Sequence, residues 1–152
     1  MSKIIPIKKI IGIDIFIPNP LRNRLKKSCD KKLILLNEDS TDLNLISKLK
    51  KITQKFNSFF IHLDSNHTHE HVLKELNLYS GFLKKGNYII SDDTIVDEIP
   101  DQTHRPRPWN SKSNPKTALN TFLKNNRDFK IDKTLNYNQM LSSCPGGYIY
   151  KR

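Results

Sequence analysis

The stretch Ile-Ile-Gly-Ile-Asp-Ile-Phe-Ile at residues 10–17 decides the fold class. Its apolar residues follow one another almost without a break and are mostly β-branched, which is typical of a strand buried on both faces of a parallel sheet. Pro18 and Pro20 end this strand. A short helix is expected after it, with Asn19 as its cap.

Three more apolar runs follow, at residues 33–36, 59–63 and 88–90, and amphipathic helical patterns separate them. This alternation predicts an α/β fold with a mostly parallel sheet and helices on both faces. We take residues 1–152 as a single domain, because the length suits one hydrophobic core.

The helices are indicated by apolar residues at helical spacing. The first has Ser40 or Thr41 as its expected cap, and its stripe is Leu45, Leu49, Ile52 and Phe56. The second has the stripe Val72, Leu73, Leu76 and Tyr79. A long loop at residues 97–114 has the length of a lid. A helix from Pro115 to about Lys124 follows it, and residues 129–131 and 147–150 are expected to pair.

The chain has 152 residues and a formal net charge of +11, with 36% hydrophobic and 27% charged residues, as in globular domains. Its basic residues are scattered pairs without interleaved aromatic residues, which favours solvated helix faces over a nucleic-acid site. No apolar run approaches the roughly 20 residues of a membrane span. The apolar stretch at the start of the sequence is too short for a signal peptide. Cys29 and Cys144 form neither a disulfide framework nor a metal knuckle. We expect a cytoplasmic protein without a nucleic-acid partner.

Acidic side chains follow all four predicted strands. They are Asp14, Asp39 beside Ser40, Asp64, and the pair Asp92 and Asp93. A single acid at a strand end is usually a helix cap, but the carboxyl ends of parallel strands are where ligands bind. Clustered carboxylates repel one another unless a cation lies among them, and oxygen ligands favour Mg²⁺, Mn²⁺ or Ca²⁺ over zinc. The sequence thus predicts a divalent-metal site built from Asp64, Asp92 and Asp93.

His67 lies three residues after Asp64, in the turn that would face this site. Its imidazole is a candidate general base, although a capping or hydrogen-bonding role fits equally well. His69 and His71 are expected to be ordinary exposed residues of the next helix.

An alternative site uses His62 and Asp64 as the start of a non-haem iron triad, with His104 as the third ligand. Alternation along a strand points the first two side chains the same way. Iron hydroxylases of this kind hold the triad in an antiparallel jelly roll, however, so the carboxylate site ranks higher.

A histidine-rich stretch, Asp-Ser-Asn-His-Thr-His-Glu-His-Val, occupies residues 64–72. It resembles the cephalosporin hydroxylase / rhamnosyl O-methyltransferase family. Further matches run over nearly the whole chain: residues 11–15, Glu75-Leu76, Asp93-Thr94, Trp109, Asn114-Pro115 with Ala118, residues 145–148, and Lys151-Arg152. The resemblance implies a Rossmann-like methyltransferase fold with S-adenosylmethionine as cofactor and a Mg²⁺ site.

The resemblance also implies roles for single residues. Asp64, Asp92 and Asp93 would bind Mg²⁺, in agreement with the argument from strand ends. Asp14 would accept hydrogen bonds from the ribose hydroxyls of the cofactor, and Asp39 and Ser40 would lie near its adenine. The cation would hold the acceptor hydroxyl and lower its pKa. The implied acceptor is a sugar or another hydroxylated small molecule, as in lipid or polysaccharide biosynthesis.

Three features depart from the family pattern. Asp92 stands where the family usually has Glu, and residues 110–113, Asn-Ser-Lys-Ser, replace a glycine-rich stretch. The family's first strand and its glycine-rich cofactor loop have no counterpart before Ile10, and residues 3–8 are too short to replace them. Because that strand would lie centrally, we expect an amino-terminally truncated sheet with two unpaired edges. A split or non-catalytic remnant, which needs an amino-terminal segment in trans or a second copy, is therefore the alternative to an active O-methyltransferase.

Overall fold

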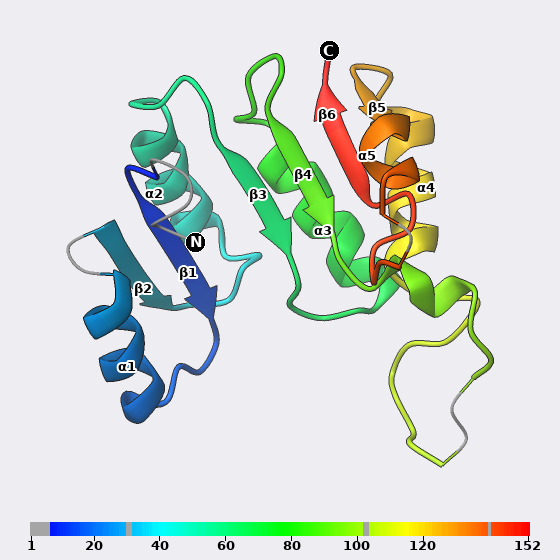
Figure 1. Ribbon diagram of the computed structural model, residues 1–152, viewed down its shortest axis with the longest axis horizontal. Helices are drawn as coiled ribbons and strands as arrows, with labels where there is room; N and C mark the ends of the chain where they lie inside the picture. Colours follow the sequence, from blue (N-terminus) through cyan, green and yellow to red (C-terminus); the bar gives the residue numbers. More distant parts are fainter. Residues whose placement is uncertain (1–6, 30–31, 102–103, 140) are drawn as a thin grey trace. The chain divides into compact units, whose positions relative to one another are not determined.

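The computed structural model describes residues 7–29, 32–101, 104–139 and 141–152. Strands and helices alternate along the chain as far as β4, as the sequence predicts (Figure 1). The chain forms two compact units, Met1–Leu45 and Ile46–Arg152, and the boundary falls within helix α2 (Leu43–Thr53). The single domain expected from the chain length stays a prediction.

In the first unit, β1 (Ile10–Asp14) and β2 (Leu33–Asn37) form a two-stranded parallel sheet. Helix α1 (Asn19–Cys29) connects them, as a parallel pair requires. Arg22 ties this helix to β2, because its guanidinium donates to the Leu35 carbonyl oxygen at 3.4 Å and to the Asn37 side chain.

Strand β1 is shorter and less buried than predicted. It ends at Asp14, and Ile15 and Phe16 are 77% and 70% exposed. The reason is local: Asp14 Oδ1 accepts a hydrogen bond from the Phe16 N–H at 2.9 Å, a turn that competes with the strand ladder. The prediction of a strand over residues 10–17, buried on both faces, is therefore wrong beyond Asp14.

The second unit holds a four-stranded sheet in the order β3-β4-β6-β5. The strands are β3 (Phe60–Leu63), β4 (Tyr88–Ser91), β6 (Tyr148–Lys151) and β5 (Phe129–Ile131). β3 and β4 pair in parallel, whereas β6 is antiparallel to both of its neighbours. A mostly parallel sheet was thus the wrong prediction here, but the pairing of the two closing segments is confirmed. Parallel pairing of β5 with β6 would need a crossover, and α5 (Lys133–Tyr137) between them has only five residues.

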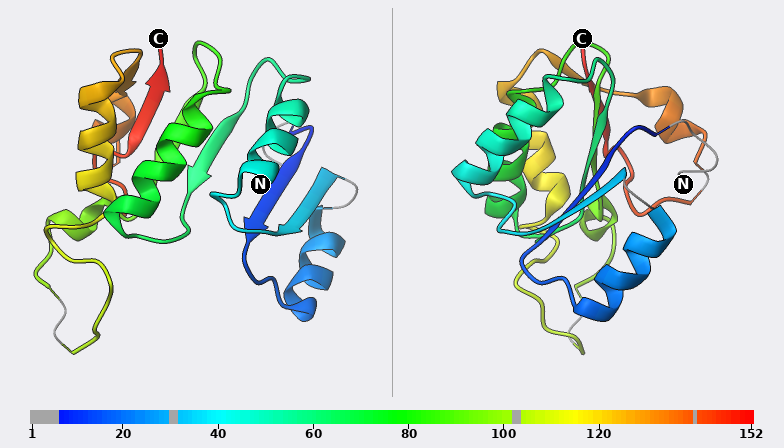
Figure 2. Two further views of the ribbon diagram at one scale, coloured as in Figure 1. Left: turned by 180° about the vertical axis from the view of Figure 1, so that it is seen from behind. Right: turned by 90° about the vertical axis from the view of Figure 1, so that its left-hand side faces the viewer.

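Helices cover this sheet unequally. α3 (His69–Ser80) and α4 (Pro115–Asn125) pack against each other on one face, and α5 lies on the opposite face (Figure 2). The hydrophobic core lies under α3 and α4, where the cross-strand pair Ile89 and Ile149 is fully buried. Helix residues complete this core, namely Val72, Leu76, Tyr79, Leu119 and Phe122. The apolar stripe predicted for α3 is confirmed at three of its positions.

Helix caps explain where two helices begin. α4 starts at Pro115, as predicted, because Asn114 accepts a hydrogen bond from the Thr117 N–H in a capping box. α2 is capped by Asp42, whose Oδ1 accepts from the N–H groups of Asn44 and Leu45. Ser40 and Thr41 were therefore the wrong residues for this cap.

β1 pairs only with β2, and β3 pairs only with β4, among the strands of the described residues. The other edge of each of these two strands has no partner strand there. Phe60 at the start of β3 is 53% exposed. Unpaired edges at these two strands agree with the expectation from the sequence. Residues 3–8, expected not to supply a strand, lie mostly outside the described residues.

Candidate metal centre

The carboxyl ends of β3 and β4 bring two of the predicted metal ligands together. The strands are parallel and in register, with Leu63 opposite Ser91. Asp64 follows β3 directly, and Asp93 follows β4 by two residues. A hydrogen bond from the Asp92 N–H to the Leu63 carbonyl oxygen, 2.9 Å long, extends the ladder past the strands and fixes this arrangement.

Asp93 has a left-handed backbone, with φ 50° and ψ 26°. It is the one non-glycine residue with a positive φ in the described part of the chain. Aspartate tolerates this conformation better than most residues, and such backbone strain is common at functional sites. The turn leads from β4 into the 3-10 helix η2 (Thr94–Asp97).

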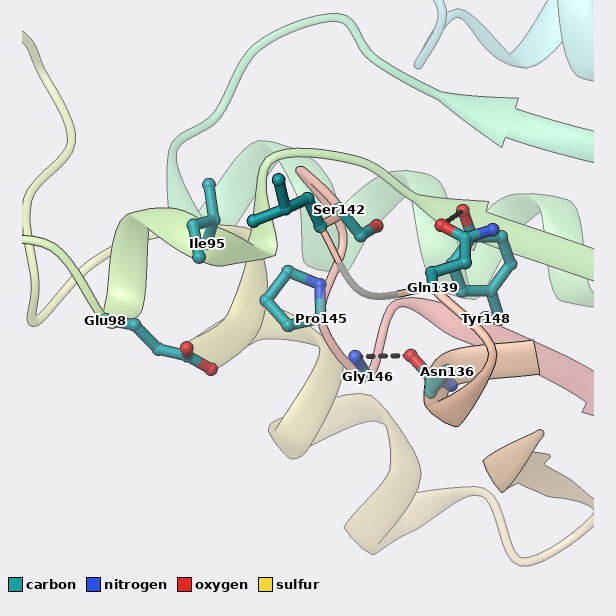
Figure 3. Close-up of a pocket in the computed structure, with 9 residues that line it drawn as sticks. Ile95, Glu98, Asn136, Gln139, Ser142, Pro145, Gly146 and Tyr148 are labelled. Carbon is teal, nitrogen blue, oxygen red and sulfur yellow. Dashed lines mark hydrogen bonds between the residues drawn. The ribbon is translucent and has the colours of Figure 1, made fainter. Parts of the chain in front are cut away.

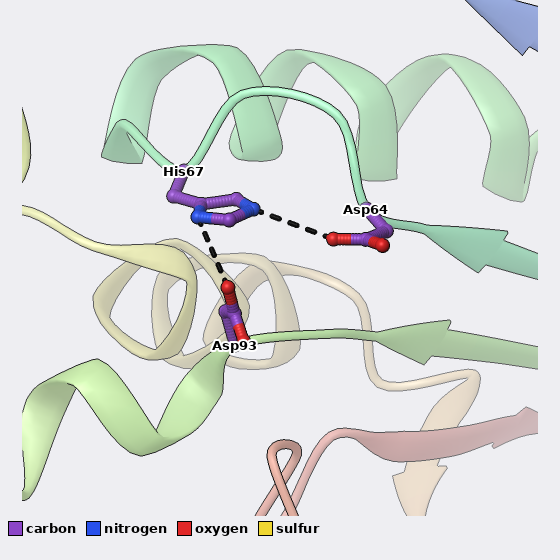
Figure 4. Close-up of side chains that lie close together, drawn as sticks. All are labelled: Asp64, His67 and Asp93. Carbon is purple, nitrogen blue, oxygen red and sulfur yellow. Dashed lines mark ion pairs between the residues drawn. The ribbon is translucent and has the colours of Figure 1, made fainter.

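The imidazole of His67 lies between the two carboxylates (Figure 4). Its Nδ1 is 3.2 Å from Asp93 Oδ2, and its Nε2 is 3.5 Å from Asp64 Oδ1. The His67 side chain is 16% exposed, compared with 57% for Asp64 and 36% for Asp93. The three residues therefore form a half-open cluster with the histidine on the inside.

This donor set fits a divalent cation. One ligand atom from each of Asp64, His67 and Asp93 lies within 4.8 Å of the others. His67 Nε2 is buried, and apart from its 3.5 Å contact with Asp64 Oδ1 it has no hydrogen-bond partner among the described residues. Such burial is costly for a polar nitrogen unless it binds an ion or water. Two carboxylate oxygens and one imidazole nitrogen suit Mg²⁺, Mn²⁺ or Fe²⁺.

The pKa values of the two adjacent aspartates are shifted in opposite directions. Burial raises the pKa of Asp93; His67 opposes this effect, and the charges of Asp92 and Asp64 raise the pKa further. Burial also raises the pKa of Asp92, but hydrogen bonds from Ser143, the Asp93 N–H and His62 outweigh it and hold that pKa below its usual value. A cation beside Asp93 would relieve the repulsion that raises its pKa.

Asp92 has a separate set of contacts. Its Oδ2 is 2.8 Å from His62 Nε2, and its Oδ1 accepts a hydrogen bond from Ser143 Oγ at 2.5 Å. The group of possible metal ligands found among the described residues contains neither Asp92 nor the His62 and His104 of the iron triad. Metal binding by Asp92 stays a prediction, and nothing in the described geometry favours the iron triad.

Next to the cluster is a cavity of about 660 Å³, here called the Trp109 cavity. His67 and Asp93 border it, and Trp109 packs its ring against the imidazole with the centroids 4.8 Å apart. Most of the other lining residues come from the long loop after η2: Ile99, Pro100, Asp101, Arg105, Pro106, Arg107 and Asn110. The two arginines were not singled out from the sequence, because exposed arginines on a loop carry no periodic signal.

One comparison with known proteins decides the family. The family model described as rhamnosyl O-methyltransferase/CmcI matches residues 1–152. The chain belongs to this family. The resemblance seen in the sequence is thereby confirmed, and the family is one of O-methyltransferases. No curated protein and no solved structure matches the chain significantly.

A second finding concerns membranes. None of the described helices is both long and apolar enough to cross a bilayer.

The cofactor residues implied by the rhamnosyl O-methyltransferase/CmcI family lie in the first unit. Asp14 ends β1, and Asp39 and Ser40 follow β2, so all three stand at the carboxyl end of the two-stranded sheet. The Asp14 carboxylate is exposed, while Asp39 Oδ1 accepts hydrogen bonds from the N–H and the hydroxyl of Thr41. Their cofactor roles stay predictions.

The histidines of α3 are not the exposed residues that the sequence indicated. His69 Nδ1 is 2.8 Å from Thr117 Oγ1 on α4, and His71 Nε2 is 3.1 Å from Ser65 Oγ. Ser65 Oγ also donates to Glu75 at 2.8 Å, although Glu75 is only 1% exposed. These hydrogen bonds fix the turn that follows Asp64. The i, i+4 spacing of His71 and Glu75 could have predicted that the two side chains lie close together.

A smaller cavity of about 270 Å³ lies beside η2 and the loop before β6 (Figure 3). Asn136 shapes it, because its Oδ1 accepts a hydrogen bond from the Gly146 N–H at 2.6 Å. Gly146 has a φ of 72°, which favours glycine at this turn. Ile95 lines both this cavity and the Trp109 cavity.

Proposed function

We propose that this protein is a divalent-cation-assisted O-methyltransferase that uses S-adenosylmethionine to methylate a hydroxyl of a small molecule. The observation that carries the proposal is the cluster of Asp64, His67 and Asp93 at the ends of β3 and β4. Membership of a family of O-methyltransferases supports it independently. A Rossmann-like methyltransferase fold and location in the cytoplasm belong to the same proposal, and the acceptor is a sugar or another hydroxylated small molecule.

In this proposal Asp64 and Asp93 hold the cation, with Asp92 as a further ligand and the imidazole of His67 beside it. A bound Mg²⁺ lowers the pKa of a coordinated hydroxyl and so prepares it for methylation. The carboxylates of Asp64 and Asp93 would neutralise the two positive charges of the cation. The Trp109 ring packs on the imidazole and would limit the access of water to His67.

His67 has two possible roles, as a ligand or as the base that accepts the hydroxyl proton. Replacement by Gln separates them. If His67 is the base, His67→Gln leaves metal affinity unchanged and abolishes turnover. If it is a ligand, the same change weakens metal binding as well.

The cofactor would lie against the first unit. Asp14 supplies an exposed carboxylate of the type that accepts hydrogen bonds from ribose hydroxyls, and Asp39 and Ser40 lie at the same end of the sheet. These residues fit a nucleoside, which needs acceptors for two hydroxyl groups.

Calorimetry tests the proposal. S-adenosylhomocysteine should bind the wild-type chain, and Mg²⁺ should bind it more tightly than it binds the Asp93→Asn variant. Asp128→Asn is the matched control, because it removes an exposed aspartate that lies outside the cluster. Transfer of a labelled methyl group to a panel of sugars and phenols then measures activity. Absence of S-adenosylhomocysteine binding with and without Mg²⁺ would overturn the proposal.

The second candidate is a non-catalytic remnant or half of a split enzyme. The observation that favours it is the outer edge of β3, which has no partner strand among the described residues and begins with the exposed Phe60. An unpaired strand edge readily accepts another strand. Cofactor binding that appears only with a second polypeptide would support this candidate.

A further inference from the structure

The lining of the Trp109 cavity combines apolar and positively charged residues. The apolar residues are Ile95, Val96, Ile99, Pro100 and Pro106. The positively charged residues are Arg105 and Arg107, and the same cavity is bordered by His67 and Asp93. A molecule bound there therefore meets the metal cluster, an apolar surface and two guanidinium groups at once.

Arg107 is held close to the cluster. Its Cζ lies 5.2 Å from the centroid of the Trp109 ring, and that ring packs on the imidazole of His67. The Trp109 ring thus contacts both the guanidinium and a candidate metal ligand. This cation–π contact limits the freedom of the arginine side chain, so its donors are presented to the cavity at a lower entropic cost.

The charges of the cavity do not balance. Neither guanidinium forms an ion pair with another described residue. Besides Asp93, the one carboxylate in the lining is Asp101, whose Oδ1 already accepts a hydrogen bond from the Ser111 N–H at 2.8 Å. Asp92 lies outside the lining and bonds to His62 and Ser143. With a divalent cation neutralising Asp64 and Asp93, the lining itself has two arginines and one aspartate. The loaded cavity carries a surplus of one positive charge.

We propose that the acceptor is a hydroxylated ring compound with a single carboxylate, bound with its hydroxyl at the metal cluster and its carboxylate at Arg105 and Arg107. The inference rests on the proposed function and names its substrate class. A guanidinium presents paired donors that match the two oxygens of a carboxylate. An apolar ring matches the apolar residues of the lining, and a monoanion matches the surplus charge. A neutral sugar leaves both arginines without a partner.

Two probes differ only in this charge. 3,4-Dihydroxybenzoate carries the carboxylate, and 3,4-dihydroxybenzamide has the same ring and hydroxyls without it. In calorimetry with saturating Mg²⁺, the wild-type chain should bind the acid at least roughly tenfold more tightly than the amide. Arg105→Gln and Arg107→Gln should each weaken binding of the acid by a similar factor and leave binding of the amide unchanged.

Arg24→Gln is the control, because Arg24 is exposed on α1 and does not line the cavity. It removes the same charge and should change neither affinity. Equal affinities for acid and amide, or equal losses of both in the arginine variants, would overturn the inference. If neither probe binds while S-adenosylhomocysteine and Mg²⁺ do, the inference alone fails. If these two ligands also fail to bind, the proposed function fails with it.

Discussion

The rings of His67 and Trp109 pack together at a centroid distance of 4.8 Å and an interplanar angle of 60°. Trp109 is the only tryptophan of the sequence. A single chromophore therefore lies against a candidate metal ligand, and its emission reports on the cluster without any label.

Addition of Mn²⁺ is expected to quench the fluorescence of Trp109, because a paramagnetic ion bound by Asp64, His67 and Asp93 would lie within a few ångströms of the ring. Mg²⁺ should compete with Mn²⁺ and restore the emission. Asp93→Asn should lower the affinity by roughly tenfold or more, since it removes a charged ligand. Asp128→Asn should behave as wild type, and saturable quenching of equal affinity in both variants would contradict the assigned site.

The pH dependence of this titration follows from the pKa of Asp93. Burial and neighbouring carboxylates raise that pKa, so a proton competes with the cation at a higher pH than at an ordinary aspartate. Mn²⁺ affinity should fall as the pH is lowered, by roughly tenfold per unit once the pH is below the pKa of Asp93. An affinity that stays constant as the pH is lowered from neutral through the usual range of an aspartate pKa would be incompatible with binding by Asp93.

A second pH effect concerns the face of the sheet opposite α3 and α4. The Tyr88 hydroxyl donates to Asp132 Oδ2 at 2.6 Å; this bond raises the pKa of Tyr88 and lowers the pKa of Asp132. The lowered pKa means that Asp132 stabilises the fold at neutral pH and that this contribution is lost as the pH falls through its folded-state pKa. The raised pKa means that the contribution of Tyr88 is lost as the pH rises through its own.

Tyr88→Phe should therefore lower the urea midpoint modestly at pH 7 and by less in acid or in strong alkali. Tyr150→Phe is the control. Its ring packs on Tyr88 at 5.7 Å, but no hydrogen bond joins its hydroxyl to another described residue. Equal midpoint shifts for the two variants at all pH values would show that the hydrogen bond to Asp132 makes no net contribution.

Local patterns explain what the sequence predicted of the fold. Burial of Val72, Leu76 and Tyr79 follows from helical spacing, and the start of α4 follows from Asn114 and Pro115. The failures come from side chains that bond to the nearby backbone. Asp14 ends β1 early and Asp42 caps α2, and neither effect is visible in a hydropathy pattern.

The candidate site shows the other limit of sequence reasoning. Asp64 and Asp93 were predictable because acids at parallel strand ends share one edge of the sheet. The contacts of Asp92 were not, since His62 and Ser143 are 30 and 51 residues away in the sequence. Adjacent aspartates look equivalent until the fold supplies different neighbours to each. The same is true of Arg107, which becomes significant only beside Trp109.

Ser65 offers the last prediction, because it links the turn after Asp64 to a buried charge. Its hydroxyl donates to Glu75 Oε1 at 2.8 Å, and Glu75 is 1% exposed. No described residue forms a hydrogen bond with Glu75 Oε2. Ser65→Ala removes a donor from a buried carboxylate and should lower the free energy of unfolding by about 1–3 kcal/mol. It should also weaken Mn²⁺ binding, since Asp64 is the preceding residue.

A double-mutant cycle distinguishes loss of the hydrogen bond between Ser65 and Glu75 from general damage to the turn. Glu75→Gln removes the charge and keeps the shape, so Ser65→Ala should cost less in that background than in the wild type. Chemical denaturation of the four proteins measures the difference. Additive losses of stability would mean that the hydroxyl of Ser65 and the carboxylate of Glu75 do not interact, and the turn after Asp64 would then owe its position to packing alone.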